Sequence, residues 1–263
     1  TPLNIAGELA AAGVRILGGR LARLICGALI VSAVAGVIWW RNPKPVPETM
    51  YFSVPFAIAA RDIAVAPNGH TVAVVGYRES ARKNVIWIYE VGSPEARSLA
   101  DTEGASFPFW SPDGQFLAFF ADGKLKKIEA AGGPVQTLCD AASGRGGSWN
   151  NDGVIIFTPS GQLGTGLSRI PAAGGGASTP ISTPDARQGW NTQRWPTFLP
   201  DGKHYLYLAA NVRGGSDVDG IYVGLLDSNE KHFVVKTSMN VAYAAGYLFF
   251  YRDKTLLAQR FDL

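Results

Sequence analysis

The sequence predicts an all-β protein, a partial β-propeller of four-stranded antiparallel blades preceded by one transmembrane α-helix. Two observations predict the propeller: a turn of the Pro-Asp-Gly type recurs along the chain, and short apolar strands flank each copy. The third observation, an uncharged apolar run near the N-terminus, predicts the helix.

The turn motif occurs four times and is followed by a degenerate fifth copy. An apolar strand leads into each turn and another leaves it, as the residues 116–120 do after the second turn. The turn glycines are Gly69, Gly114, Gly153, Gly202 and Gly246, at spacings of 45, 39, 49 and 44 residues. These spacings match the length of one propeller blade. We expect each glycine to take the positive φ that such turns require.

Each repeat also contains a second pair of strands. The third strands are predicted at residues 85–89, 124–128, 167–170 and 220–224, and outer strands at residues such as 135–138 and 232–235. The fifth repeat stops in its third strand, residues 255–262. Because an open end would leave a sheet edge unpaired, we expect further blades outside this chain. Evenly spaced strands also suit a β-sandwich, but repetition of one motif favours the propeller.

The apolar run extends from Leu24 to Trp40, 17 residues with Ser32 as the one polar side chain. As a helix it would be about 25 Å long, which is the lower limit for a membrane span. Two alternatives remain open: a secretory signal, since the residues 33–35 resemble a cleavage site, and a buried core helix. A span divides the chain into a juxtamembrane segment (1–23), the helix (24–40), a Pro-rich linker (41–50) and the propeller (51–263).

Charge is unevenly distributed along the chain. Five basic residues and one acidic residue precede residue 45, which leaves 19 basic and 20 acidic residues for the remainder. The basic excess therefore flanks the apolar run, where it suits lipid headgroups. It mildly favours a cytoplasmic N-terminus with the propeller outside. The near-neutral propeller offers no basic face for nucleic acid, so no nucleic-acid partner is expected.

The predicted helix carries small residues at every fourth position. Ala28, Ser32 and Gly36 would form one stripe, which is the kind of face through which two membrane helices approach each other. Small residues are also common in membrane spans that do not pair. The stripe predicts a candidate homodimer contact.

The repeats resemble the propeller repeat of TolB-like proteins, in which Ser/Ala-Pro-Asp-Gly precedes an apolar strand. Residues 111–114 match this motif fully, 66–69 and 199–202 match it nearly, and 150–153 lack the proline. The resemblance implies a TolB-like, WD-type β-propeller.

Longer stretches resemble the periplasmic sensor region of bacterial membrane-anchored serine/threonine protein kinases. These stretches are the residues 104–128, 132–140, 194–202 and 256–262. The resemblance implies a propeller on the outer side of the bacterial inner membrane, joined through one span to a cytoplasmic kinase. It also leaves two relatives open, the propeller of prolyl-oligopeptidase-type peptidases and a secreted TolB-like envelope protein.

The sequence contains no recognisable catalytic, cofactor or metal site. The kinase motifs and the Gly-x-Ser-x-Gly signature of serine hydrolases are missing from these 263 residues. His70 and His204 follow turn glycines, so they are expected to decorate turns. Cys26 and Cys139 lie in different regions and are not expected to pair. We therefore expect no enzyme activity from this chain itself.

Turn aspartates and aromatic residues are the remaining candidates. Asp113, Asp152 and Asp201 share one repeat position, which indicates a structural role as acceptors of backbone N–H bonds. Tryptophans and arginines near blade starts suggest a site for a peptide, glycan or protein, although the tryptophans also suit packing between blades. The candidate binding residues are Trp110, Arg145, Trp149, Trp190, Arg194 and Trp195.

Overall fold

The fold was determined as a computed structural model, which describes residues 60–262 except 94, 186, 188, 212 and 214–218. In this part of the chain nearly all regular structure is β-strand, with one short 3-10 helix at Glu79–Ala81. The predicted membrane helix, its Ala28-Ser32-Gly36 face and the Pro-rich linker lie outside the described residues. Within the described ranges, no helix is long and apolar enough to cross a membrane.

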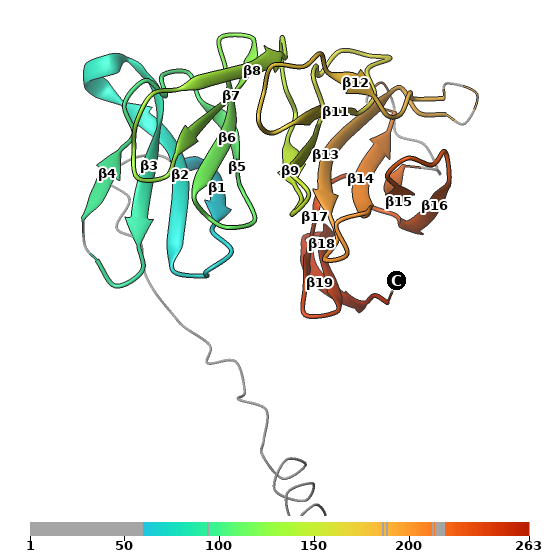
Figure 1. Cartoon of the computed structure of the whole chain (residues 1–263). Coiled ribbons are helices and arrows are strands. Elements are labelled where there is room, and N and C mark those ends of the chain that lie inside the picture. The colour runs from blue at the N-terminus through green and yellow to red at the C-terminus, as the bar shows by residue number, and fades with distance from the viewer. Residues whose placement is uncertain are drawn as a thin grey trace, which may run out of the picture. The chain divides into compact units, whose positions relative to one another are not determined.

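The strands form five sheets that follow one another in chain order (Figure 1). The first two blades contain β1 (Ala60–Val65), β2 (Thr71–Arg78), β3 (Lys83–Glu90), β4 (Ala96–Ser98), β5 (Ser106–Trp110), β6 (Phe116–Ala121), β7 (Lys124–Glu129) and β8 (Gln136–Asp140). The next three contain β9 (Gly147–Trp149), β10 (Val154–Phe157), β11 (Ser168–Pro171), β12 (Thr179–Pro180), β13 (Thr192–Phe198), β14 (His204–Ala210), β15 (Gly220–Leu225), β16 (Lys231–Val235), β17 (Val241–Ala244), β18 (Tyr247–Arg252) and β19 (Thr255–Arg260).

This topology confirms the predicted all-β propeller of four-stranded blades. Blades 1 to 4 each contain four antiparallel strands in sequence order, and blade 5 contains the three strands β17, β18 and β19. The predicted third strand of the last repeat is therefore present as β19. Every pairing joins strands that are adjacent in the chain, so each blade is a meander.

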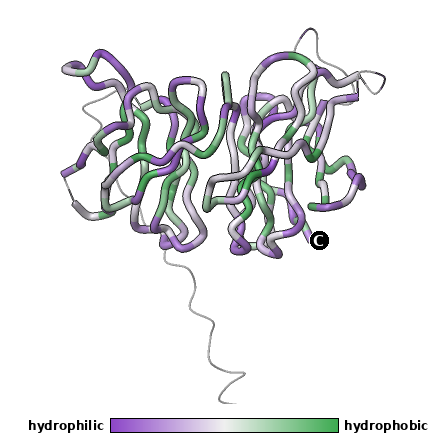
Figure 2. The backbone as a smooth tube through the Cα atoms, turned by 45° about the horizontal axis from the view of Figure 1, so that its top comes forward, coloured by the Kyte–Doolittle hydropathy of each residue, from purple (hydrophilic) through white to green (hydrophobic). Residues whose placement is uncertain are grey.

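The apolar core lies between consecutive blades. Figure 2 shows hydrophobic positions along the strands and hydrophilic ones at the loops. Phe119 on β6 is fully buried in the cluster that joins blade 2 to Val75 and Ile86 of blade 1. Similar clusters join blade 2 to blade 3, blade 3 to blade 4 and blade 4 to blade 5. Alternate strand residues face opposite neighbours, so one blade contributes to two clusters.

The five turn glycines all have positive φ, between 68° and 81°. In the four full copies the glycine N–H donates to the carbonyl three residues earlier, at 2.9 to 3.2 Å. In the degenerate copy both Ala245 and Gly246 have positive φ, which is the geometry of a type I′ hairpin. The sequence prediction for these turns is confirmed, although the last blade achieves the turn differently.

The predicted role of the turn aspartates is correct for two and wrong for the third. Oδ1 of Asp113 accepts the N–H of Gln115, and Oδ1 of Asp201 accepts the N–H groups of residues 203 and 204. In blade 3 the acceptor is Asn150, whose Oδ1 receives the N–H groups of Asp152 and Val154. Asn150 takes the first turn position, where blade 2 has Ser111, and Asn151 replaces the proline. The Val154 N–H that it accepts is equivalent to the Gln115 N–H that Asp113 accepts in blade 2.

Asn150 also joins two blades, which makes it the more sensitive turn residue. Its Nδ2 donates to the Gly202 carbonyl of blade 4 at 2.8 Å, and the side chain is buried. Replacement of Asn150 by alanine is expected to lower the free energy of unfolding by about 1–3 kcal/mol, because the part-buried backbone groups of residues 152, 154 and 202 lose their partner. Asp152→Ala, the matched control, should change it by less than about 0.5 kcal/mol. Urea denaturation measures both, and equal losses would contradict this assignment.

Candidate functional site

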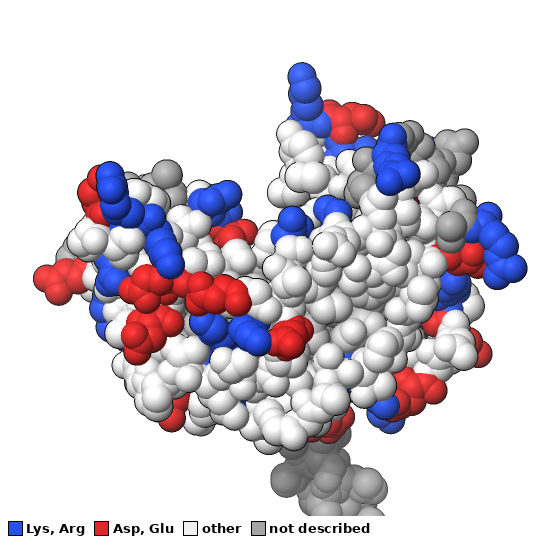
Figure 3. All heavy atoms as spheres, turned by 90° about the horizontal axis from the view of Figure 1, so that it is seen from above, with Lys and Arg blue, Asp and Glu red and all other residues white. Residues whose placement is uncertain are grey.

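The first strands of the blades surround one pocket, which we call the axial pocket. Its volume is about 510 Å³. It is lined by the residues 61–63 of β1, 107–108 of β5, 146–147 at β9, 195–197 of β13 and 239–240 just before β17. Figure 3 shows a hollow on the face seen from above, with Lys and Arg side chains beside it and acidic side chains close by.

One repeat position supplies a pocket residue from every blade. This position lies seven residues before the turn glycine, and all five of its residues line the axial pocket. They are Asp62, Phe107, Gly146, Trp195 and Met239. The pocket is therefore a product of the repeat, with a different residue at this position in each of the five blades.

Two of these positions have strained backbone. Phe107 and Trp195 have φ of 48° and 53°, and a proline follows each of them. Bulky residues rarely adopt positive φ, and such a residue costs about 1–3 kcal/mol. The register of β5 and of β13 shifts at these residues, so each is a β-bulge. Bulges of this kind redirect side chains, and here they direct two aromatic rings into the pocket wall.

Polar contacts hold both bulges in place. The Phe107 N–H donates to Oδ2 of Asp62 at 3.2 Å, and the Trp195 N–H donates to the Arg145 carbonyl at 2.9 Å. Each contact joins neighbouring blades. The strained conformations are therefore supported by the blade interfaces.

A glycine-rich segment, residues 144–147, carries Arg145 between blades 2 and 4. A β-carbon on Gly144 would overlap the Phe120 ring, and one on Gly147 would lie 2.7 Å from Cε1 of Phe109. Gly146 has a φ of 87°, and a β-carbon there would lie 2.9 Å from Cδ1 of Trp195. The backbone thus lies directly against three aromatic rings, which fixes the position of Arg145.

Arg145 and Arg194, the arginine pair, lie together beside the axial pocket. Nη2 of Arg194 donates to the Gly161 carbonyl at 3.3 Å, and a β-carbon on Gly161 would be 3.0 Å from Nε of Arg145. The Arg145 guanidinium also stands 5.8 Å from the centre of the Phe107 ring. Burial lowers the pKa of Arg194, and the charge of Arg145 lowers it further. Two like charges are thus held close in a half-buried setting.

Of the six predicted binding residues, the structure brings Arg145, Arg194 and Trp195 together and places the other three elsewhere. Trp110 is buried between blades 1 and 2, where its Nε1 donates to the Ala64 carbonyl at 2.9 Å. Trp149 is half-buried beside Phe116 and the Lys127 amine. Trp190 is buried, with its ring centre 4.5 Å from that of Tyr222.

Sequence reasoning missed Asp62, Phe107, Gly146 and Met239. A usable signal was present, because an aromatic-proline pair stands seven residues before the turn glycine in two blades (Phe107-Pro108 and Trp195-Pro196). Alignment of all five repeats on that position identifies one pocket residue from each blade.

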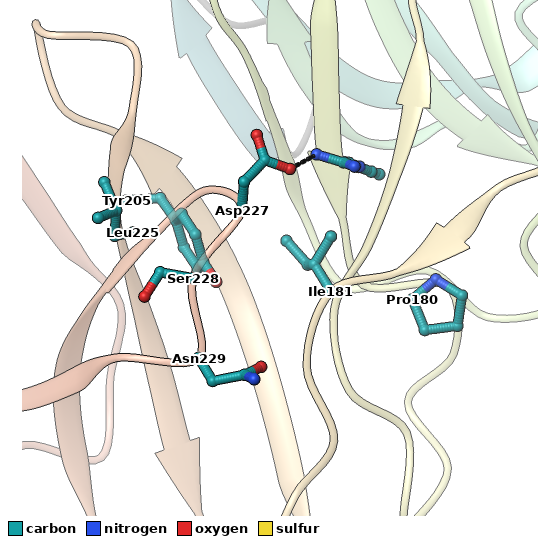
Figure 4. A pocket seen from close by; sticks show the side chains of 8 residues that line it. Pro180, Ile181, Tyr205, Leu225, Asp227, Ser228 and Asn229 are labelled. Carbon is teal, nitrogen blue, oxygen red and sulfur yellow. Dashed lines mark hydrogen bonds and ion pairs between the residues drawn. The ribbon is translucent and has the colours of Figure 1, made fainter.

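A second, smaller pocket of about 170 Å³ lies between blades 3 and 4. Figure 4 shows Pro180 and Ile181 on one side, with Asp227, Ser228 and Asn229 on the other. An ion pair between Arg169 and Asp227 crosses it. Asp227 is largely exposed and Arg169 partly so, and solvent screening therefore keeps the contribution of the pair to stability small.

Among the described residues, no group of three or more His, Cys, Asp or Glu side chains is arranged to hold a metal ion. His70 and His204 contact their own turns, through the Asn68 carbonyl and the Asp201 carboxylate. Cys139 is a free thiol, and burial together with the Asp140 charge raises its pKa to about 11.

These features define the class: the described chain is a β-propeller domain whose blades surround a ligand-sized axial pocket. No family model and no curated protein sequence matches the chain. Solved structures do match it in fold. The TolB structure from Acinetobacter baumannii aligns with a TM-score of 0.60 and 14% identity, over 76% of this chain and 51% of that one.

A putative TolB from Agrobacterium tumefaciens gives a TM-score of 0.57 and 17% identity, over 73% and 70% of the two chains. An oligogalacturonate lyase from Vibrio parahaemolyticus gives 0.53 and 12% identity, over 73% and 56%. The chain thus spans about half the length of the Acinetobacter TolB. The fold is a TolB-like β-propeller, as the turn motif predicts.

Proposed function

We propose that this chain is a binding module that recognises a ligand in its axial pocket, held outside the bacterial inner membrane by a helix at residues 24–40. One observation carries the binding proposal. A single repeat position contributes a pocket residue from all five blades, and two of those residues are held in strained conformations. Strain of this kind is retained where the surrounding structure and function require it.

The chemistry of the pocket suits recognition. Phe107, Trp195 and Met239 supply apolar contact surface, while Arg61 and Asp62 supply charge. A concave site that combines aromatic walls with a few charged groups is typical of ligand pockets. A volume of about 510 Å³ accommodates a ligand of a few residues or sugar rings.

We propose further that the parent protein is a membrane-anchored serine/threonine kinase, for which this propeller is the sensor. The support is the resemblance of residues 104–128 and 194–202 to such sensors, together with the uncharged run before the propeller. An open reading frame with a kinase domain upstream of residue 1 is expected. A hydrolase domain with Gly-x-Ser-x-Gly downstream of residue 263 would instead indicate the peptidase alternative.

Hydrogen exchange tests the binding site. Peptides and glycans released from a bacterial envelope by mild digestion are added to the full chain. Exchange is expected to slow in the first strands, at residues 61–63, 107–109, 146–148 and 194–198, because a ligand in the axial pocket stabilises their local structure. Mass spectrometry of the fragments measures the change.

Thr197→Trp, which fills the pocket, should abolish this protection, whereas Thr255→Trp on the exposed edge strand β19 should leave it unchanged. Protection that is absent, or that persists in Thr197→Trp, would contradict the proposed site.

For the membrane proposal, alkaline phosphatase fused after residue 263 is expected to be active, since that enzyme requires an oxidising compartment. An inactive but stable fusion would place the propeller inside the cell.

A further inference from the structure

The arginine pair has guanidinium N–H donors without an acceptor among the described residues. Nη1 of Arg145 donates to the carbonyls of Ser143 and Gly144, at 3.3 and 3.0 Å. Its Nε–Nη2 edge, one of the two forked edges of a guanidinium, has no acceptor among the described residues. Arg194 uses Nε and Nη2, toward Thr192 and Gly161, and its Nη1 has no acceptor there either.

No acidic side chain of the described residues forms an ion pair with Arg145 or Arg194. Within the described part of the chain, every ion pair involves other residues, so no carboxylate lies within 4.0 Å of either guanidinium. Asp62 is the acidic residue of the axial pocket, and its Oδ2 is occupied by the Phe107 N–H. Arg61 adds a third positive charge to the same region.

The pair is also fixed before any ligand arrives. Arg145 is carried by backbone that lies against the rings of Phe120, Phe109 and Trp195, and its guanidinium rests over Phe107. Arg194 is anchored by Thr192, which is fully buried. Two guanidiniums held close without a counter-charge form a preorganised oxyanion site, because an anion would remove their mutual repulsion without rearrangement.

We propose that the arginine pair binds a phosphate group of the ligand. This inference deepens the proposed binding function by naming a chemical class. A phosphate dianion neutralises both guanidiniums, whereas one carboxylate leaves a positive charge. Three phosphate oxygens also match the free donors on two separate side chains, since Arg145 offers a forked edge and Arg194 a single amine.

Calorimetric titration of inorganic phosphate into the full chain, at constant ionic strength, tests the assignment. We expect saturable binding by the unmodified chain. Arg145→Gln and Arg194→Gln should each weaken it by at least about tenfold, the loss typical of one charge-assisted contact. Arg260→Gln, which removes the same charge from the exposed edge strand β19, is the matched control and should bind phosphate as the unmodified chain does.

Arg145→Lys keeps the charge but loses the forked edge, so it should also bind more weakly than the unmodified chain. Circular dichroism establishes that each variant is folded. Equal phosphate affinity in the unmodified chain and in folded Arg145→Gln and Arg194→Gln would overturn the proposal. Acetate binding as tightly as phosphate at the same ionic strength would overturn the assignment to a dianion.

The two proposals fail separately. If the envelope extract slows hydrogen exchange at the axial pocket but inorganic phosphate does not bind, the phosphate assignment is wrong and the binding function is still supported. Phosphate binding that depends on the arginine pair, without any extract protection, would support the anion site and count against the proposed ligand of the axial pocket.

Discussion

Replacement of Phe119 by alanine is expected to lower the free energy of unfolding by about 3–5 kcal/mol, which is the usual cost of deleting a buried Phe side chain. The ring is fully buried between blades 1 and 2, where it packs with Val75, Ile86 and Ile88. The cost includes the lost free energy of transferring the ring out of water and the cavity left behind. The two packed sheets cannot move together far enough to fill that cavity.

Urea denaturation of the full chain measures this loss, with Phe233→Ala as the control. Phe233 lies on β16 and is 51% exposed, with one ring contact to Tyr222. Its removal should cost at most about 1 kcal/mol. A loss at Phe119 no larger than that at Phe233 would mean that the interface between blades 1 and 2 does not carry the stability inferred for it.

Replacement of Gly144 by alanine has the second-largest expected effect, a loss of about 1–3 kcal/mol or more from overpacking. The added methyl group would overlap the buried Phe120 ring, which is itself packed against Phe157 and Phe109. Relief therefore requires movement of either the blade core or the segment that carries Arg145. In the second case phosphate binding should weaken along with stability.

Gly176→Ala is the matched control for this prediction. A β-carbon there would lie 3.8 Å from Cδ of Pro171, an ordinary contact, and the φ of Gly176 is not positive. The midpoint of thermal or urea unfolding should change little in this variant. If Gly144→Ala proves as stable as Gly176→Ala, residues 144–147 are less tightly held than the structure indicates.

The fold was predictable because each repeat contains the residues that its turn requires, above all the glycine. Gly114 and its counterparts take positive φ as predicted, and the strands on either side form within a few residues of the predicted bounds. Asn150 escaped prediction because it replaces the turn aspartate from two positions earlier, through a side-chain contact that motif matching does not register.

The site was predictable only in part. Trp110 and Trp149 share one repeat position, four residues before the turn glycine, and both lie against a neighbouring blade. Trp195 stands three residues earlier in its repeat and lines the pocket. Size and aromaticity do not distinguish these positions. Strand geometry distinguishes them, and the bulges at Phe107 and Trp195 depend on hydrogen bonds between blades that no single repeat encodes.

The meander order of the sheets has a consequence for how the chain is made. Every blade draws all its strands from one uninterrupted stretch, so hydrogen-bonded pairing never waits for distant residues. During synthesis or export, blade 1 can form all its strand pairings before β5 has emerged. Each later blade can then pack against a blade that is already folded. Assembly would then advance from the N-terminal blade, and the axial pocket would stay incomplete at least until residues 239–240 are made, because they line it.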